Sequence, residues 1–232
     1  RNIYLKLFYT DIYNIDYDFM NTQQVKNHEI FINRFTGRHD TAKMVMPNIN
    51  ETSKQLVDNL LQNLPSSKIN IALCLRSGIK YKDWSMQNFL TVIKNLNNNY
   101  QANFYIIGSK NDYDYAQKFI QQSNLPIQNF CGKTTLPQLG YLLKQSNLLL
   151  SVDTGTAHIA AAQETNTVVI FTGTSHKHWA PYGNTVKIVF PKINCYPCND
   201  IQRKKCPNYQ CLNKININEV IQNCKNLLEM RF

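Results

Sequence analysis

Short apolar runs alternate with longer amphipathic stretches along most of this chain. Apolar runs that are too short for helices predict strands at 69–75, 103–107, 148–152, 167–171 and 186–190. The spacing of apolar positions between and after them predicts helices at 85–96, 112–122, 136–145, 156–163 and 220–228. Alternation of this kind is typical of β-α units that build a parallel sheet. The pattern therefore predicts an α/β fold, a Rossmann-like doubly wound parallel sheet, over residues 66–232.

The first sixty-five residues follow a different pattern. They are rich in Tyr, Asp and Asn, and helical spacing occurs only at 24–35 and 50–62. The stretch 64–68 combines Pro and Ser and is typical of a linker. Because the chain begins at Arg1 inside sequence with a structured pattern, we expect a further portion upstream. We place a domain boundary near residue 65 and interpret residues 1–65 as the remnant of another domain.

Charge and composition narrow the classes of partner. The 232 residues are 43% hydrophobic, with no run approaching the roughly 20 apolar residues of a membrane-spanning helix. Twenty-five Lys and Arg against fifteen Asp and Glu give a net charge of +10, and the sequence pI is about 9.2. Such a chain is attracted to phosphates or to anionic membrane surfaces.

One segment combines a strand end, a helix start and polar side chains. Asp153, Thr154 and Gly155 follow the apolar run at 148–152, and His158 lies one turn into the next helix. Unpaired amides at such a helix start bind anions, and a carboxylate accepts hydrogen bonds from sugar hydroxyls, so the segment fits a nucleotide sugar. The alternative is that Asp153 or Thr154 only caps the helix and His158 is an ordinary polar residue.

Two more loops follow predicted strands. In the loop 76–84, Ser77 and Lys82 are candidates to hold a diphosphate, because a lysine neutralises a phosphate leaving group without a metal. The alternative is a solvated basic loop in which Trp84 packs on the following helix. After the next strand, Asp112 is a candidate to bind ribose hydroxyls or to cap a helix.

Four cysteines precede the last predicted helix. Their spacing, Cys-x2-Cys-x7-Cys-x4-Cys, permits a structural zinc site, and it also permits disulfides or free thiols. It is looser than a pair of Cys-x2-Cys knuckles, and a catalytic metal is not expected. The four are Cys195, Cys198, Cys206 and Cys211.

Taken in order, these segments resemble glycosyltransferase family 9, the heptosyltransferases of bacterial lipopolysaccharide synthesis. Asp153-Thr-Gly-x-x-His158 matches the most specific motif of that family. The resemblance extends from residue 69 to the C-terminus, with a weaker likeness in 27–47. The other matching segments are Lys82–Phe89, Gly108–Ala116, Cys131–Leu136, Phe171–Thr174 and Trp179–Gly183.

The resemblance implies a GT-B architecture, of which this chain carries the C-terminal, nucleotide-sugar-binding half. It implies that Ser77 and Lys82 contact the donor phosphates, with Lys82 stabilising the leaving group, and that Asp112 contacts the ribose. It further implies that Asp153, Thr154, Gly155 and His158 cradle the diphosphate and the sugar. Two positions depart from the family pattern, since Asp112 replaces the commoner Glu and Ser77-Gly78 stands where some members have paired Thr.

The implied reaction is inverting transfer of a heptose or a related sugar, with ADP-heptose as the expected donor, to a lipid-linked lipopolysaccharide core oligosaccharide. No metal or other cofactor is expected, and the implied location is cytoplasmic, peripheral at the inner membrane of a Gram-negative bacterium. Family members carry a general base, an Asp, early in the first domain, and no segment here matches it. We therefore expect donor binding without the base; if the chain did transfer sugar, Asp11, Asp16 or Asp18 would be the first to test.

A rival interpretation comes from another class of protein. Basic charge, thirteen Tyr and a four-Cys segment are compatible with a nucleic-acid-binding module. The lysines and arginines are dispersed rather than clustered, so we do not expect nucleic acid as a partner. A dehydrogenase is disfavoured because no strand runs into Gly-x-Gly-x-x-Gly, and a serine hydrolase because there is no Gly-x-Ser-x-Gly.

Overall fold

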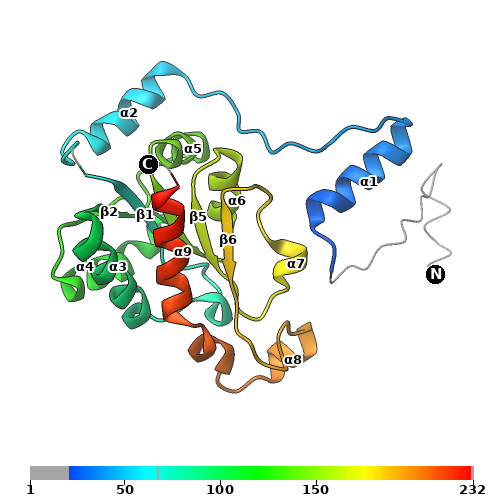
Figure 1. The fold of residues 1–232 in the computed structure, drawn as a ribbon. Coiled ribbons are helices and arrows are strands. Elements are labelled where there is room, and N and C mark those ends of the chain that lie inside the picture. Colours follow the sequence, from blue (N-terminus) through cyan, green and yellow to red (C-terminus); the bar gives the residue numbers. More distant parts are fainter. Residues whose placement is uncertain (1–20, 67, 231–232) are drawn as a thin grey trace.

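A six-stranded, all-parallel sheet forms the centre of the molecule (Figure 1). The computed structural model describes residues 21–66 and 68–230. The strand order is β3-β2-β1-β4-β5-β6, that of a doubly wound Rossmann-like fold, which confirms the predicted fold class. The strands are β1 (Asn70–Cys74), β2 (Asn103–Ile106), β3 (Ile127–Asn129), β4 (Leu148–Val152), β5 (Thr167–Ile170) and β6 (Val186–Val189).

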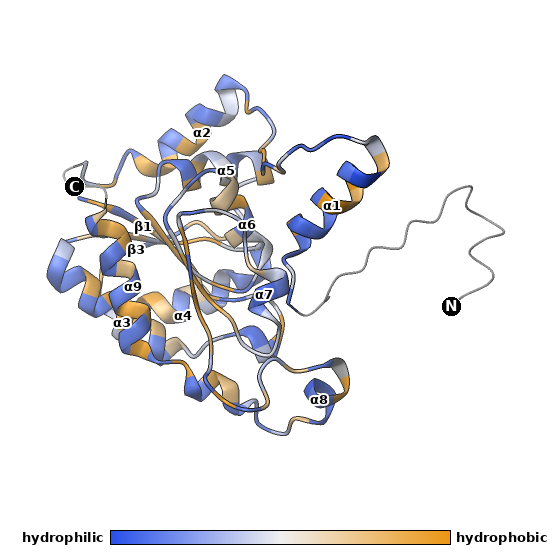
Figure 2. Ribbon diagram, turned by 45° about the vertical axis from the view of Figure 1, so that its right-hand side comes forward, coloured by the Kyte–Doolittle hydropathy of each residue, from blue (hydrophilic) through white to orange (hydrophobic). Residues whose placement is uncertain are grey.

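The apolar runs correctly predicted the five longer strands, but they did not predict β3. That strand has only three residues, and its middle residue, Gln128, is exposed while its two neighbours are buried. So short an alternation carries no periodic signal. The strands β1, β2, β4 and β5 are buried along most of their length because helices cover both faces of the sheet, as all-parallel sheets require, and Figure 2 shows them mostly in hydrophobic colours. The last strand in the order, β6, has a single buried residue, Val189.

One face of the sheet is covered by three helices, α3 (Met86–Tyr100), α4 (Tyr113–Ser123) and α9 (Ile217–Glu229). Their apolar stripes pack with alternate strand residues in a single core. Phe89 and Phe119, for example, are fully buried. The start of α3 is also encoded locally, because Ser85 caps it: the Ser85 hydroxyl accepts the Asn88 backbone N–H.

The other face carries α2 (Glu51–Leu61), α5 (Leu136–Lys144) and α6 (Gly155–Ala162). A capping box of Thr135 and Gln138 starts α5. Although α2 precedes the expected boundary near residue 65, its Val57 is 1% exposed and packs in the core of this face. The boundary at 65 remains a prediction.

Three helices lie outside these two layers. The helix α1 (Gln24–Thr36) is joined to α2 by a long extended segment and stands to one side of the sheet in Figure 1. The short α7 (His176–Trp179) and α8 (Asp200–Lys205) follow β5 and β6. The sequence pattern predicted α1 and missed α7 and α8, which have four and six residues and no room for a stripe. In the described part of the chain, no helix combines the length and the apolar character needed to cross a membrane.

Asparagine side chains join the strands at the amino-terminal edge of the sheet. Asn103 donates its amide to the Asn70 side chain at 3.0 Å, which links the starts of β2 and β1. Asn147, just before β4, accepts the Asn70 backbone N–H at 2.8 Å. Asn166 donates to the Leu227 carbonyl at 2.7 Å and so joins the start of β5 to α9. Neutral amides therefore hold this edge.

Candidate functional site

The loops that leave β1, β2 and β4 surround a pocket of about 440 Å³ at the carboxyl edge of the sheet. β1 lies between β2 and β4, so the pocket sits where the strand order reverses, the place at which open α/β sheets bind ligands. Its polar lining residues are Arg76, Ser77, Ser109, Asn111, Asp112, Thr134, Thr154 and Thr156. Three residues expected in the site, Ser77, Asp112 and Thr154, thus share one pocket.

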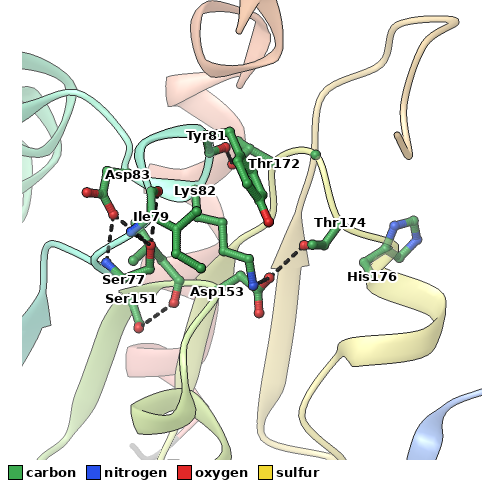
Figure 3. A network of polar contacts seen from close by, with 12 residues as sticks. Ser77, Ile79, Tyr81, Lys82, Asp83, Ser151, Asp153, Thr172, Thr174 and His176 are labelled. Carbon is green, nitrogen blue, oxygen red and sulfur yellow. Dashed lines mark hydrogen bonds and ion pairs between the residues drawn. The ribbon is translucent and has the colours of Figure 1, made fainter. Parts of the chain in front are cut away.

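Next to this pocket, Lys82 and Asp153 form an ion pair (Figure 3). The Lys82 ammonium lies 2.7 Å from Oδ2 of Asp153, and the two side chains are only 17% and 6% exposed. The Thr174 hydroxyl, from the loop after β5, donates to the same carboxylate oxygen at 2.6 Å. Three loops therefore meet at one carboxylate, and the two charged residues predicted from separate motifs are in direct contact.

Asp153 does not cap α6, contrary to the alternative drawn from its sequence. The N-cap position belongs to Thr154, which makes no side-chain cap hydrogen bond within the described chain. A Cβ built on Gly155, the first helical residue, meets nothing within 4 Å. An anion can therefore approach the first turn of α6, where amide groups and the helix dipole favour negative charge.

Ser77 is held in place by a neighbour that the sequence analysis did not single out. Asp83 accepts the Ser77 N–H at 2.7 Å and its hydroxyl at 2.8 Å, and it also accepts a hydrogen bond from Arg76 at 3.3 Å. Gly78 follows with a φ of +78°, a conformation that favours glycine. Asp83 shapes the loop after β1, and Ser77 lines the pocket from that loop.

Asp112 both caps a helix turn and lines the pocket. Its Oδ2 accepts the Ser109 N–H at 2.9 Å and the Ser109 hydroxyl at 2.6 Å, in a capping box that starts the turn before α4. Its Oδ1 lies 3.8 Å from the Arg76 guanidinium. The capping alternative is thus confirmed, while the contact with a ribose stays a prediction.

His158 faces a different side of the site from Ser77 and Asp112. Burial lowers its pKa from the ordinary 6.5, and the positive charge of Lys82 acts in the same direction, whereas Asp153 opposes the shift. His158 lines a second hollow of about 270 Å³, mostly with apolar neighbours that include Trp179 and Tyr182. A neutral imidazole in this hollow can accept or donate a hydrogen bond.

Trp84 packs on the helix that follows its loop, as the alternative interpretation of that loop expected. It is 1% exposed and packs edge-on against Phe89 of α3, with ring centroids 5.1 Å apart. Its role is therefore to fix the start of α3 behind the Ser77 loop.

Comparison with known proteins agrees with this arrangement. The model of glycosyltransferase family 9 (heptosyltransferase) matches residues 7–209 of the chain. The chain belongs to glycosyltransferase family 9. The motifs that resembled this family are thus part of a match over most of the sequence.

Curated relatives of this family 9 chain are bacterial heptosyltransferases. Lipooligosaccharide heptosyltransferase 2 of Campylobacter jejuni is 26% identical over 153 residues, 64% of this chain and 47% of the relative. Lipopolysaccharide heptosyltransferase 3 of Escherichia coli is 32% identical over 108 residues, 46% of this chain and 32% of the relative. The chain thus spans about half the length of the first of these relatives, and the second match is shorter.

Solved structures share the fold. Family 9 glycosyl transferase from Veillonella parvula superposes with a TM-score of 0.82 at 20% identity, covering 98% of this chain and 65% of that one. ADP-heptose LPS heptosyltransferase II of Escherichia coli gives 0.67 at 18% identity, covering 84% and 56%.

The cysteine segment of this family 9 chain holds free thiols. Cys211 is buried, Cys198 and Cys206 are half-buried, and Cys195 is exposed. Within the described ranges, no three His, Cys, Asp or Glu side chains come together as a metal site, so the structure does not assemble the zinc site that the spacing permitted. Burial raises the pKa of the Cys198 and Cys211 thiols, and their neighbouring cysteines add to the shift.

Proposed function

We propose that this chain is the donor-binding part of a heptosyltransferase, and that it holds a nucleotide-activated heptose, with ADP-heptose as the first candidate. The observation that carries the proposal is the Lys82–Asp153–Thr174 contact beside the accessible first turn of α6. A cation and free amide groups favour a diphosphate, and a carboxylate favours sugar hydroxyls. All of these groups lie at the carboxyl edge of a doubly wound sheet.

In this proposal different residues contact the diphosphate, the ribose and the sugar of the donor. The amides of Thr154 and Gly155 bind the diphosphate, together with Ser77, which lines the same pocket as Thr154. Lys82 leaves its contact with Asp153 far enough to neutralise the charge that grows on the diphosphate as the glycosidic bond breaks. Asp153 then accepts hydrogen bonds from the sugar, Asp112 contacts the ribose, and His158 faces the sugar side. Inversion follows when the acceptor hydroxyl attacks from the face opposite the leaving diphosphate.

The names of the relatives support the heptose, and one solved structure supports the nucleotide. The curated relatives named above are heptosyltransferases of lipooligosaccharide or lipopolysaccharide. A heptosyltransferase of Escherichia coli has been solved with ADP, and it shares this fold with a TM-score of 0.66 at 15% identity, over 97% of this chain and 62% of that one. We propose a lipopolysaccharide core oligosaccharide as acceptor. The positive charge of this chain favours peripheral association with an anionic membrane surface, which we propose to be the cytoplasmic face of a Gram-negative inner membrane.

Calorimetric titration with a panel of nucleotide sugars and free nucleotide diphosphates tests the donor. We expect ADP-heptose to bind most tightly, and we expect Lys82→Ala to weaken that binding. Lys80→Ala is the matched control, because Lys80 is an exposed lysine two positions away that changes the net charge equally. Equal loss in both variants, or a panel with no binding at all, would contradict the proposal. Tight, steeply salt-dependent binding of single-stranded nucleic acid would favour the rival class instead.

We further propose that residues 1–232 bind the donor without transferring sugar at an enzymatic rate. The groups assigned above all follow residue 69, whereas the general base of the family belongs to its first domain. Asp11, Asp16 and Asp18 lie outside the described residues. Transfer by this chain alone at a normal rate would refute the proposal and would make these three the first candidates for the base.

A further inference from the structure

Arg203 lies in the cysteine segment, outside the motifs assigned to the donor site, yet it contacts both loops that flank Asp153. It belongs to α8, and Nη1 of its guanidinium donates to the Gly173 carbonyl at 3.4 Å and to the Cys198 carbonyl at 2.9 Å. The same guanidinium lies over the ring of Tyr81, 5.4 Å from its centroid. One side chain thus connects three separate segments.

Each contacted loop residue is the direct neighbour of a residue in the donor site. Tyr81 precedes Lys82, and Gly173 precedes Thr174. Lys82 and Thr174 are the two groups that converge on Oδ2 of Asp153. The contacts therefore form a closed ring that runs from Arg203 through one loop to Asp153 and back through the other.

The two loops also contact one another directly. The Thr172 hydroxyl donates to the Tyr81 carbonyl (Figure 3). Gly173 has a φ of +71°, and a Cβ at this position would lie 3.0 Å from Cδ2 of Tyr81. The Cys198 N–H donates to the Gly173 carbonyl at 2.9 Å, next to the Arg203 contact. The two loops are therefore closely packed, and Arg203 and Cys198 both contact the Gly173 carbonyl.

We propose that Arg203 is a positioning residue for the donor site: it sets the spacing of Lys82 and Thr174 around Asp153 through Tyr81 and Gly173. This inference rests on the proposed function, because it assumes that the three residues bind the nucleotide sugar. A planar guanidinium suits the task, since it presents several donors to carbonyls while its face lies on an aromatic ring. The role of the cysteine segment is then to carry Arg203 against these two loops.

The test uses the whole chain and the nucleotide sugar that the native protein binds most tightly. Arg203→Ala should weaken its binding about tenfold, as expected for a supporting contact that orders two binding groups. Lys204→Ala is the matched control. Lys204 is the next residue of α8 and is exposed, and its replacement by Ala removes the same charge as Arg203→Ala. We expect its affinity to equal that of the native protein.

A double-mutant cycle separates positioning from general stability. Tyr81→Leu removes the ring that Arg203 covers, so the combined variant should bind no more weakly than the weaker single variant. Additive losses, or a lowered melting temperature with unchanged affinity, would overturn the inference. If Arg203→Ala fails to fold, Arg203→Lys keeps the charge and most of the stem but lacks the planar fork, and native affinity in it would overturn the inference. Absence of nucleotide-sugar binding by the native chain would instead refute the proposed function.

Discussion

Removing both charges of the Lys82–Asp153 pair should restore the stability that removal of either charge destroys. The ion pair is 2.7 Å long and its side chains are 17% and 6% exposed, so each ion depends on the other for solvation. Asp153→Asn leaves the ammonium beside a neutral amide, and Lys82→Met leaves a buried carboxylate that keeps the Thr174 hydrogen bond but has lost its cation. Breaking a buried pair from one side costs about 3–5 kcal/mol.

The remaining exposure of Lys82 admits some water, so we expect the lower end, about 3 kcal/mol, for each single variant. For a domain of this size this corresponds to a fall in melting temperature of about 6–12 °C. The double variant Lys82→Met/Asp153→Asn has no unpaired charge and should lie within about 1 kcal/mol of the native protein. It should nevertheless bind the nucleotide sugar much more weakly, because two of the proposed donor contacts are gone.

Urea denaturation of the four proteins measures the coupling, and calorimetry measures binding. The surface pair Lys54–Glu51 is the control, since Glu51 is 80% exposed and the same cycle there should show no measurable coupling. Additive single effects at Lys82 and Asp153 would refute the ion-pair argument. Native affinity in the stable double variant would refute the role of the pair in donor binding.

Three further outcomes are expected. Stability should fall as pH drops below about 6.5, because burial lowers the pKa of His158 and His176 in the fold and the unfolded chain then binds more protons; urea titrations at several pH values should show a smaller loss in His158→Gln. Gly173→Ala should cost about 1–2 kcal/mol from its left-handed conformation alone, and it should also weaken nucleotide-sugar binding in calorimetry. Donor affinity should be unchanged in excess chelator. Metal-dependent transferases commonly hold their ion between an Asp-x-Asp pair and the diphosphate, and Asp112-Tyr-Asp114, which has that spacing, lies outside the Asp153 loop. A fall in affinity by orders of magnitude would contradict the proposal that Lys82 and the start of α6 bind the diphosphate.

The fold was largely predictable because its strands are buried runs and its main helices carry a clear stripe. The prediction failed where an element was too short to show a period, as in β3 and α8. It also left Asp112 open between two roles, because a carboxylate at the start of a helix turn suits both capping and binding. The structure shows the cap through Ser109, and the pocket lining as well.

The individual site residues were predicted more completely than their contacts. Asp153 and Lys82 were found in separate motifs, since each follows a strand and has a chemistry that fits a nucleotide sugar. Nothing in the sequence signals that they pair, because 70 residues separate them and only the β1–β4 pairing brings their loops together. Arg203 was missed for the same reason: its contacts are with carbonyls and a ring face, and neither leaves a pattern along the chain.

The asparagine ties at the amino-terminal edge of the sheet give its two edges different sensitivity to acid and salt. Side-chain amides such as those of Asn70, Asn103 and Asn166 carry no charge, so neither protonation nor ionic screening weakens their hydrogen bonds. The carboxyl edge depends instead on carboxylates, Asp83 and Asp153 among them. In acidic or concentrated salt solution, protection against amide hydrogen exchange, measured relative to the intrinsic rate at the same pH, should therefore be lost first in the loops around the ligand pocket, while the strand starts stay protected.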